Sequence, residues 1–237
     1  MPAGFTLYDP ARLWYTSFVK HPQQHNHLSL CEDIGALFAH ACEEQEDIEQ
    51  VLFENLTLEG GAYPALTFRN CRFISCRISG CSLERAGFID CIFEQCDLSN
   101  TQLQKGSLQR VHLSDCKLLG VALTGSFLLD TAFERCVARY ANLSGSKLRH
   151  ARFADCDLTS ASIFACKLSS TSFAHCLLTR AELFQTAFAG MDLSNCDLSG
   201  IALGGGELRG ARVSAEQAAM LGQMLAGVII EESLPQK

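Results

Sequence analysis

Thirteen cysteines give this chain of 237 residues its widest range of chemistry, since thiolates bind metals, form disulfides and act as nucleophiles. Eleven of them lie between residues 71 and 196, always at positions that end in 1 or 6. Spacings that are multiples of five contain no Cys-x-x-Cys pair, which is the arrangement typical of zinc and redox sites. Cys31 and Cys42 fall outside this series and have no reactive setting. The pattern therefore favours small, polarizable side chains packed in a narrow interior.

The seven histidines show no catalytic or metal-binding arrangement. His21, His25 and His27 form a cluster without a carboxylate or cysteine at matched spacing, so we interpret it as a polar segment. The other four histidines do not recur at a common spacing, and none stands beside a Ser or Cys nucleophile: His40, His112, His150 and His175. The chain also lacks a phosphate loop, a dinucleotide fingerprint and a zinc-protease signature. We therefore expect no enzyme, no metal site and no cofactor.

The cysteine spacing is part of a five-residue period that runs without interruption from residue 53 to residue 213. All 33 positions in this range that end in 3 or 8 are apolar, and 30 of them are Leu, Ile or Phe. Two residues before each of them, no position carries a charge. Both positions are expected to point inward and the residue between them outward. Because an α-helix of 3.6 residues per turn cannot keep such a stripe on one face, each unit is predicted to be a short strand and a turn.

A longer period of twenty residues indicates that four units form one coil. Cysteine occupies one inward position in seven successive steps, from Cys76 to Cys196. The last residue of many units is of a type that favours turns, as at Gly80, Asn100, Gly120, Gly125, Gly145, Ser160 and Gly200. Identical residues stacked on one wall predict an all-β solenoid with four walls and about eight coils. Stacked parallel side chains disfavour both disulfides and tetrahedral metal sites.

Units such as residues 96–100 (CDLSN), 141–145 (ANLSG) and 196–200 (CDLSG) resemble the pentapeptide-repeat family. The resemblance covers residues 51–213 and implies a right-handed quadrilateral β-helix. It implies less about function, because family members range from proteins that bind DNA gyrase to secreted effectors.

The flanks of the repeat predict caps, which a solenoid needs to cover its open ends. We divide the chain into an acidic N-terminal segment with a capping helix (1–50), the repeat (51–213) and a C-terminal helix with an apolar segment (214–237). The first helix is predicted over residues 30–46, with Ser29 as its N-cap. The second is predicted to begin at a capping box of Ser214 and Gln217.

The apolar C-terminus is similar to that of quinolone-resistance pentapeptide proteins, which implies a homodimer. The expected dimer contacts are Leu221, Leu225, Val228, Ile229 and Ile230. A capping segment that folds back on its own rod explains the same residues.

The net negative charge of the chain lies at its two ends. The formal net charge is −7, with −6 in residues 1–50, +1 in residues 51–213 and −2 in residues 214–237. A nearly neutral repeat argues against direct nucleic-acid binding. We find neither an export signal nor an apolar run of about 18 residues, and so expect a cytoplasmic protein that does not contact membranes.

Four outward aromatic or aliphatic residues are candidate partner contacts: Phe127, Leu129, Phe164 and Phe184. Stacking along the ladder is an equally good interpretation of the aromatic ones. We therefore expect a non-enzymatic scaffold for a protein partner. Its most specific form, implied by the resemblance, is a mimic of duplex DNA that binds gyrase or topoisomerase IV. The alternative is a bacterial effector or accessory protein with a recognition N-terminus and a rod-like spacer.

Overall fold

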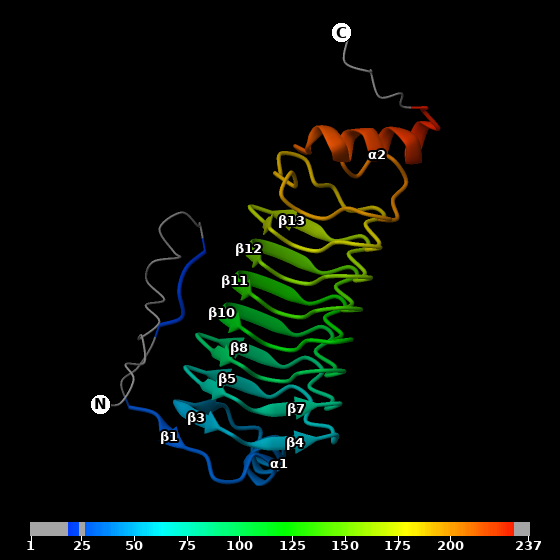
Figure 1. The fold of residues 1–237 in the computed structure, drawn as a ribbon. Helices are drawn as coiled ribbons and strands as arrows, with labels where there is room; N and C mark the ends of the chain where they lie inside the picture. The colour runs from blue at the N-terminus through cyan, green and yellow to red at the C-terminus, as the bar shows by residue number, and fades with distance from the viewer. Residues whose placement is uncertain (1–18, 24–26, 230–237) are drawn as a thin grey trace, which may run out of the picture.

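The repeat forms a β-solenoid of about seven turns, with a helix at each end (Figure 1). The computed structural model describes residues 19–23 and 27–229. Its strands and helices are β1 (Ser29–Leu30), α1 (Ile34–Glu44), β2 (Ile48–Glu49), β3 (Val51–Glu54), β4 (Thr57–Glu59), β5 (Thr67–Arg69), β6 (Arg72–Ile74), β7 (Arg77–Ser79), β8 (Gly87–Ile89), β9 (Ile92–Glu94), β10 (Ser107–Ser114), β11 (Phe127–Glu134), β12 (Lys147–Ala154), β13 (Lys167–Ser169), β14 (Ser172–Ala174) and α2 (Ala215–Ala226). The predicted all-β solenoid is confirmed.

The twenty-residue period is the register of the sheets. Within the repeat, paired strands are parallel and join a residue to the one twenty positions later, as between Leu108 and Leu128 and between Phe133 and Phe153. Single bridges on the other walls keep the same offset. The solenoid has about seven turns, where the sequence predicted about eight. At about 4.8 Å per turn, seven turns make a rod of roughly 34 Å.

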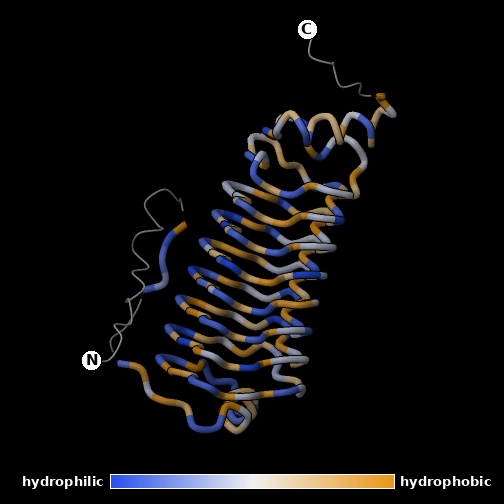
Figure 2. The backbone as a smooth tube through the Cα atoms, viewed as in Figure 1, coloured by the Kyte–Doolittle hydropathy of each residue, from blue (hydrophilic) through white to orange (hydrophobic). Residues whose placement is uncertain are grey.

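The core is the interior of the rod. It holds two sets of inward residues: the large apolar residues at positions ending in 3 or 8, and the small residues at positions ending in 1 or 6. Figure 2 shows apolar and polar residues alternating along every turn. Phenylalanine rings stack between turns, with centroids 4.4 Å apart from Phe53 to Phe73 and again from Phe73 to Phe93. A second stack joins Phe133, Phe153 and Phe173 at 4.7 and 5.0 Å. Parallel stacking is enforced by the register, because identical residues lie one strand spacing apart.

Cysteine, serine and threonine share the second inward set for a common reason. Each side chain is small, and all except Cys76 donate a hydrogen bond to the main-chain carbonyl 23 residues earlier, in the preceding turn. The Cys96 Sγ lies 3.4 Å from the Phe73 oxygen, and the Ser126 Oγ lies 2.8 Å from the Leu103 oxygen. A hydroxyl or thiol there fills a narrow space without leaving a polar atom unpaired.

The last residue of almost every unit adopts a left-handed conformation, which bends the chain at each corner. The φ angle is 56° at Asn100 and 64° at Gly120, and the same sign recurs every five residues. Asparagine, aspartate and glycine adopt this conformation at least cost, which explains their frequency at these positions. The predicted turn residues are confirmed.

Helix α1 covers the first turn. Its Phe38 is fully buried against rings of the repeat, with centroids 5.1 Å from Phe68 and 5.6 Å from Tyr63. The prediction that Ser29 caps this helix was wrong. Asp33 is the N-cap, accepting a hydrogen bond from the Ala36 N–H, while Ser29 lies in β1.

Helix α2 covers the last turn and begins with the predicted capping box. The Ser214 Oγ accepts from the Gln217 N–H, and the Gln217 side chain accepts from the Ser214 N–H. The Gln217 amide also donates to two carbonyls of the last turn, those of Leu193 and Cys196. One side chain therefore both starts the helix and fixes it to the rod.

Candidate functional site: the covered outer face

One wall of the rod has outward-pointing residues that are nevertheless buried. They come from β9, β10, β11 and β12 and comprise Ile92, His112, Ser114, Ala132, Glu134 and Ala154. The three apolar members do not belong to the interior core. We call this wall the covered face. Ile92, His112 and Ala132 stand between two inward positions and point outward as expected, but a segment from outside the repeat lies over this wall.

Residues 19–23 lie on the covered face, and we call them the N-terminal strap. The Gln23 N–H donates to the Asp90 carboxylate at 2.9 Å, and the Lys20 N–H donates to the Asp130 carboxylate at 3.4 Å. Val19 is buried although it is not part of the core. The strap therefore runs from the β11 level towards the first turn, beside the rod (Figure 1).

The spacing of the two carboxylates matches an extended peptide. Asp90 and Asp130 lie two turns apart, about 9.6 Å at 4.8 Å per strand. Lys20 and Gln23 are three residues apart, about 10 Å in an extended chain. The distance between these two corner carboxylates therefore matches the distance between the two strap amides that they accept.

Each of these carboxylates is also paired along the corner. Two Arg110 nitrogens donate to the two Asp90 oxygens at 2.7 and 2.6 Å. The His150 Nδ1 lies 3.1 Å from Asp130. Because Asp90 and Asp130 have side-chain exposures of only 8% and 6%, these bonds compensate for the loss of water.

A third carboxylate lies in the middle of the face. Glu134 has a side-chain exposure of 3% and lies 3.5 Å from the His112 Nε2 and 3.8 Å from Arg135. The neighbouring His112 imidazole is the main reason that the pKa of Glu134 is lowered, although burial acts in the opposite direction. Arg152 of β12 adds a favourable charge.

His21 of the strap is the titratable group that meets this cluster. Its pKa is lowered, mainly because the wall removes water from the imidazole and secondly because His112 is close; Glu134 acts in the opposite direction. A lowered histidine pKa means that docking favours the neutral ring. Docking is therefore complete above the ordinary value of 6.5 and weakens as the pH falls below it.

We expect acid to loosen the strap. Protection of the Lys20 and Gln23 amides against hydrogen exchange, expressed relative to the intrinsic rate at each pH, is expected to fall between pH 7.5 and 5.5. His21→Asn removes the imidazole of the strap and leaves the residues of the rod unchanged, so it serves as the control. Protection that stays constant in the wild type, or that falls equally in His21→Asn, would contradict the prediction.

The four outward residues predicted as partner contacts lie on two separate parts of the rod. Phe127 and Leu129 are half-buried on β11, on the same side of the Asp130 corner. Phe164 and Phe184 are 39% and 38% exposed on successive turns of another wall. Among the described residues no ring contact joins Phe164 to Phe184, so they do not form the stack that was the alternative interpretation.

The C-terminal residues predicted as dimer contacts divide into two groups. Leu221 is buried against the last turn and belongs to the core. Leu225, Val228 and Ile229 are exposed, Ile229 to 87%. Ile230 lies outside the described residues. Together with exposed Met224, these side chains form an apolar end to the rod, which stays a predicted dimer contact.

The cysteines show no reactive arrangement in the structure. All thirteen are free thiols, and all except Cys42 are buried. Burial raises the pKa of Cys166 to about 11, and burial and Glu43 raise that of Cys42. In residues 19–23 and 27–229, no group of three His, Cys, Asp or Glu side chains is placed to hold a metal ion.

We expect about one of the thirteen thiols, Cys42, to react with a disulfide reagent in the native protein at pH 8, and all thirteen in denaturant. The reason is that burial inside the rod blocks access of the reagent to the other thiols. A thiol titration with and without guanidinium measures the difference, and Cys42→Ser should remove the native signal. Rapid native reaction of several thiols would contradict the packed arrangement.

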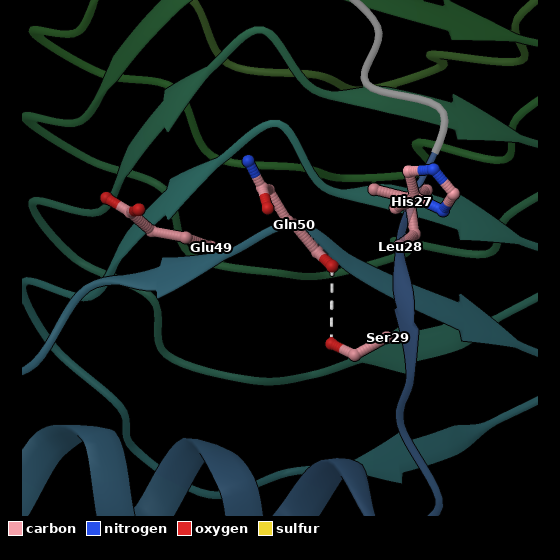
Figure 3. Close-up of a pocket in the computed structure, with 5 residues that line it drawn as sticks. All are labelled: His27, Leu28, Ser29, Glu49 and Gln50. Atoms are coloured by element: carbon pink, nitrogen blue, oxygen red, sulfur yellow. Dashed lines mark hydrogen bonds between the residues drawn. The ribbon is translucent and has the colours of Figure 1, made fainter.

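An open depression of about 440 Å³ lies beside β1 at the lower end of the rod (Figure 3). It is lined by His27, Leu28, Ser29, Glu49 and Gln50, and the Ser29 hydroxyl donates to the Gln50 carbonyl at 3.2 Å. No described pair of these side chains forms a nucleophile and base, so the depression has the chemistry of a polar surface. No described helix is both long and apolar enough to cross a membrane.

A parallel solenoid with small inward side chains and capped ends defines a class of repeat scaffold, and the family comparison identifies it. A family model described as a pentapeptide repeat region matches residues 86–163, and one described as pentapeptide repeats (8 copies) matches residues 67–104 and 161–200. The chain therefore belongs to the pentapeptide-repeat proteins.

Two solved structures are similar to this chain at low sequence identity. HetL, a pentapeptide repeat protein involved in heterocyst differentiation regulation from the cyanobacterium Nostoc sp. strain PCC 7120, is 19% identical with a TM-score of 0.42, covering 77% of this chain and 98% of HetL. Full-length QnrB1, a plasmid-mediated fluoroquinolone resistance protein, is 19% identical with a TM-score of 0.28, covering 75% and 100% of the two chains. A comparison with curated proteins found no match.

Proposed function

We propose that this protein is a non-catalytic scaffold that binds another protein through the walls or the apolar end of its rod. The observation that carries the proposal is the division of the side chains. Groups with chemical reactivity, above all the cysteines, lie inside the rod, whereas regular ladders of polar and charged residues face outward. Such an arrangement offers surface for recognition and no constellation for catalysis among the described residues.

The most specific candidate partner is a type II topoisomerase, gyrase or topoisomerase IV, engaged by mimicry of duplex DNA. QnrB1 is described as a fluoroquinolone resistance protein, and fluoroquinolones are quinolone drugs. The exposed Leu225, Val228 and Ile229 support a dimer through the C-terminal end, which would double the length of the rod. The charges of the repeat are interspersed rather than uniformly acidic, as in the Asp115–Arg135 and Asp157–Arg139 pairs. Recognition by such a surface would depend on pattern and shape more than on net charge.

The alternative, an effector whose N-terminus recognises a target, is less well supported. Helix α1 and strands β1 and β2 are built into the first turn, and residues 19–23 are docked on the covered face. An N-terminus displayed for recognition would not be expected to cover the open end of the rod.

The test is gyrase supercoiling with and without a quinolone, run beside light scattering. Protection of gyrase by the wild-type dimer, lost in a monomeric Val228→Glu variant, is the expected result. Gln223→Glu is the matched control, since it adds the same charge at an exposed polar position of α2. No effect on supercoiling or on drug inhibition over a wide titration would remove topoisomerases as partners and leave the coarser scaffold function standing.

A further inference from the structure

The covered face has the chemistry of a binding site that accepts an extended peptide. A segment that only had to cover the rod permanently would be held most simply by apolar contacts. Here the strap backbone is instead held by two buried carboxylates, Asp90 and Asp130, which accept its amides. Arg110 and His150 pair with these carboxylates within the rod, and each carboxylate in addition accepts a main-chain amide of the strap.

Several parts of the face act together on a bound segment. The carboxylates fix its register, because they lie two turns apart and select amides three residues apart. The outward apolar residues Ile92, Ala132 and Ala154 provide a shallow dry surface that is separate from the core. At the centre of the face, Glu134 and His112 lie near the imidazole of His21, so this position suits a ring that can form hydrogen bonds.

The strap is a weakly held occupant of this site. Its described contacts include two main-chain bonds to side chains, the buried Val19 and the approach of His21 to His112 and Glu134, and no described strand of the sheet pairs with it. Local segments with few buried contacts open at a small fraction of the global unfolding free energy. The strap can therefore leave while the rod stays folded.

We propose that the covered face is a docking site for an extended segment of a partner protein, and that residues 19–23 occupy it in competition with that segment. The partner segment carries an apolar residue at the place of Val19, two free amides three residues apart and an imidazole between them. This inference rests on the proposed scaffold function and names the surface through which it acts. The strap is then an internal competitor that raises the threshold for partner binding.

The experiment uses the full-length chain and a fluorescent peptide with the sequence of residues 16–23. In Val19→Glu the strap loses its apolar anchor and leaves an intact face open. The peptide is expected to bind this variant at a ratio of one to one, at least about tenfold more tightly than wild type, where the strap competes at high effective concentration. The same peptide with glutamate in place of valine is expected not to bind.

The carboxylates provide the decisive control. Adding Asp90→Asn and Asp130→Asn to the Val19→Glu chain is expected to abolish peptide binding. Asp115→Asn is the matched variant, because Asp115 also pairs with an arginine at a corner but makes no hydrogen bond with the described strap. It is expected to leave binding unchanged, and circular dichroism confirms that each variant is folded.

Equal binding to wild type and Val19→Glu, binding that survives the double asparagine change, or no binding at all would each overturn the proposal. These outcomes are separate from the proposed scaffold function, because the assay contains neither topoisomerase nor any other partner. Conversely, a negative gyrase result leaves peptide binding at the covered face unaffected.

Discussion

Replacing Phe38 with alanine is expected to lower the stability of the N-terminal end by about 3–5 kcal/mol and to release helix α1. The Phe38 ring is fully buried, and its centroid lies within 5.1 to 6.0 Å of those of Phe53, Tyr63 and Phe68. Strands β1 and β2 each pair through only two residues, so they cannot hold the first turn without the helix.

Loss of the cap would expose the unpaired edge of the first turn, which is a template for association. We therefore expect Phe38→Ala to associate with rising concentration in light scattering, and hydrogen exchange to increase from α1 to β3. His40→Ala is the matched control, because His40 lies exposed on the same helix. A Phe38→Ala protein that stays monomeric and exchanges like His40→Ala would show that α1 does not protect the end of the rod.

The periodic part of the molecule could be predicted because every turn packs the same kinds of residue at the same positions. An inward leucine or phenylalanine, a small inward donor and a left-handed corner recur at fixed spacing, so the signal adds over 33 units. Cysteine could be assigned to packing on the same ground, and the structure places it as a donor to the preceding turn.

Contacts made once were harder to predict. Ser29 and Asp33 are both good N-cap residues, and the choice of Asp33 depends on Ser29 being used in β1, a pairing with Val51 that no local pattern reveals. The strap likewise joins residues that are 67 and 110 positions apart.

The covered face nevertheless left a signal in the sequence. On this wall the outward positions include Ile92, Ala132 and Ala154, whereas equivalent positions elsewhere are mostly polar. Apolar residues at outward positions on neighbouring turns indicate that something covers them. The identity of the covering segment could not be predicted from these contacts. Its two hydrogen bonds to the face are donated by main-chain N–H groups, which nearly every residue type carries.

Phe73→Ala is expected to destabilise the folded rod by about 3–5 kcal/mol, as a truncation inside a close-packed stack. The Phe73 ring stacks at 4.4 Å on both Phe53 and Phe93, so removing it leaves two ring faces without a partner. An apolar void of about 20 Å³ already lies beside this ring and would merge with the new cavity. Neighbouring turns cannot close the gap, because their spacing is set by main-chain hydrogen bonds.

The comparison that isolates packing is Phe164→Ala, the same truncation at a ring that is 39% exposed. Denaturant unfolding is expected to show a loss below about 1 kcal/mol for Phe164→Ala, since little buried area is removed. The Phe73 cavity would be apolar and dry, so benzene is expected to raise the melting temperature of Phe73→Ala and not that of Phe164→Ala. Similar losses in the two variants, with no effect of benzene, would mean that the stacked rings fill the rod without stabilising it. Because Phe73 is held from both sides whereas Phe38 is held from one, the interior change should weaken the rod as a whole and the cap change should begin at its end.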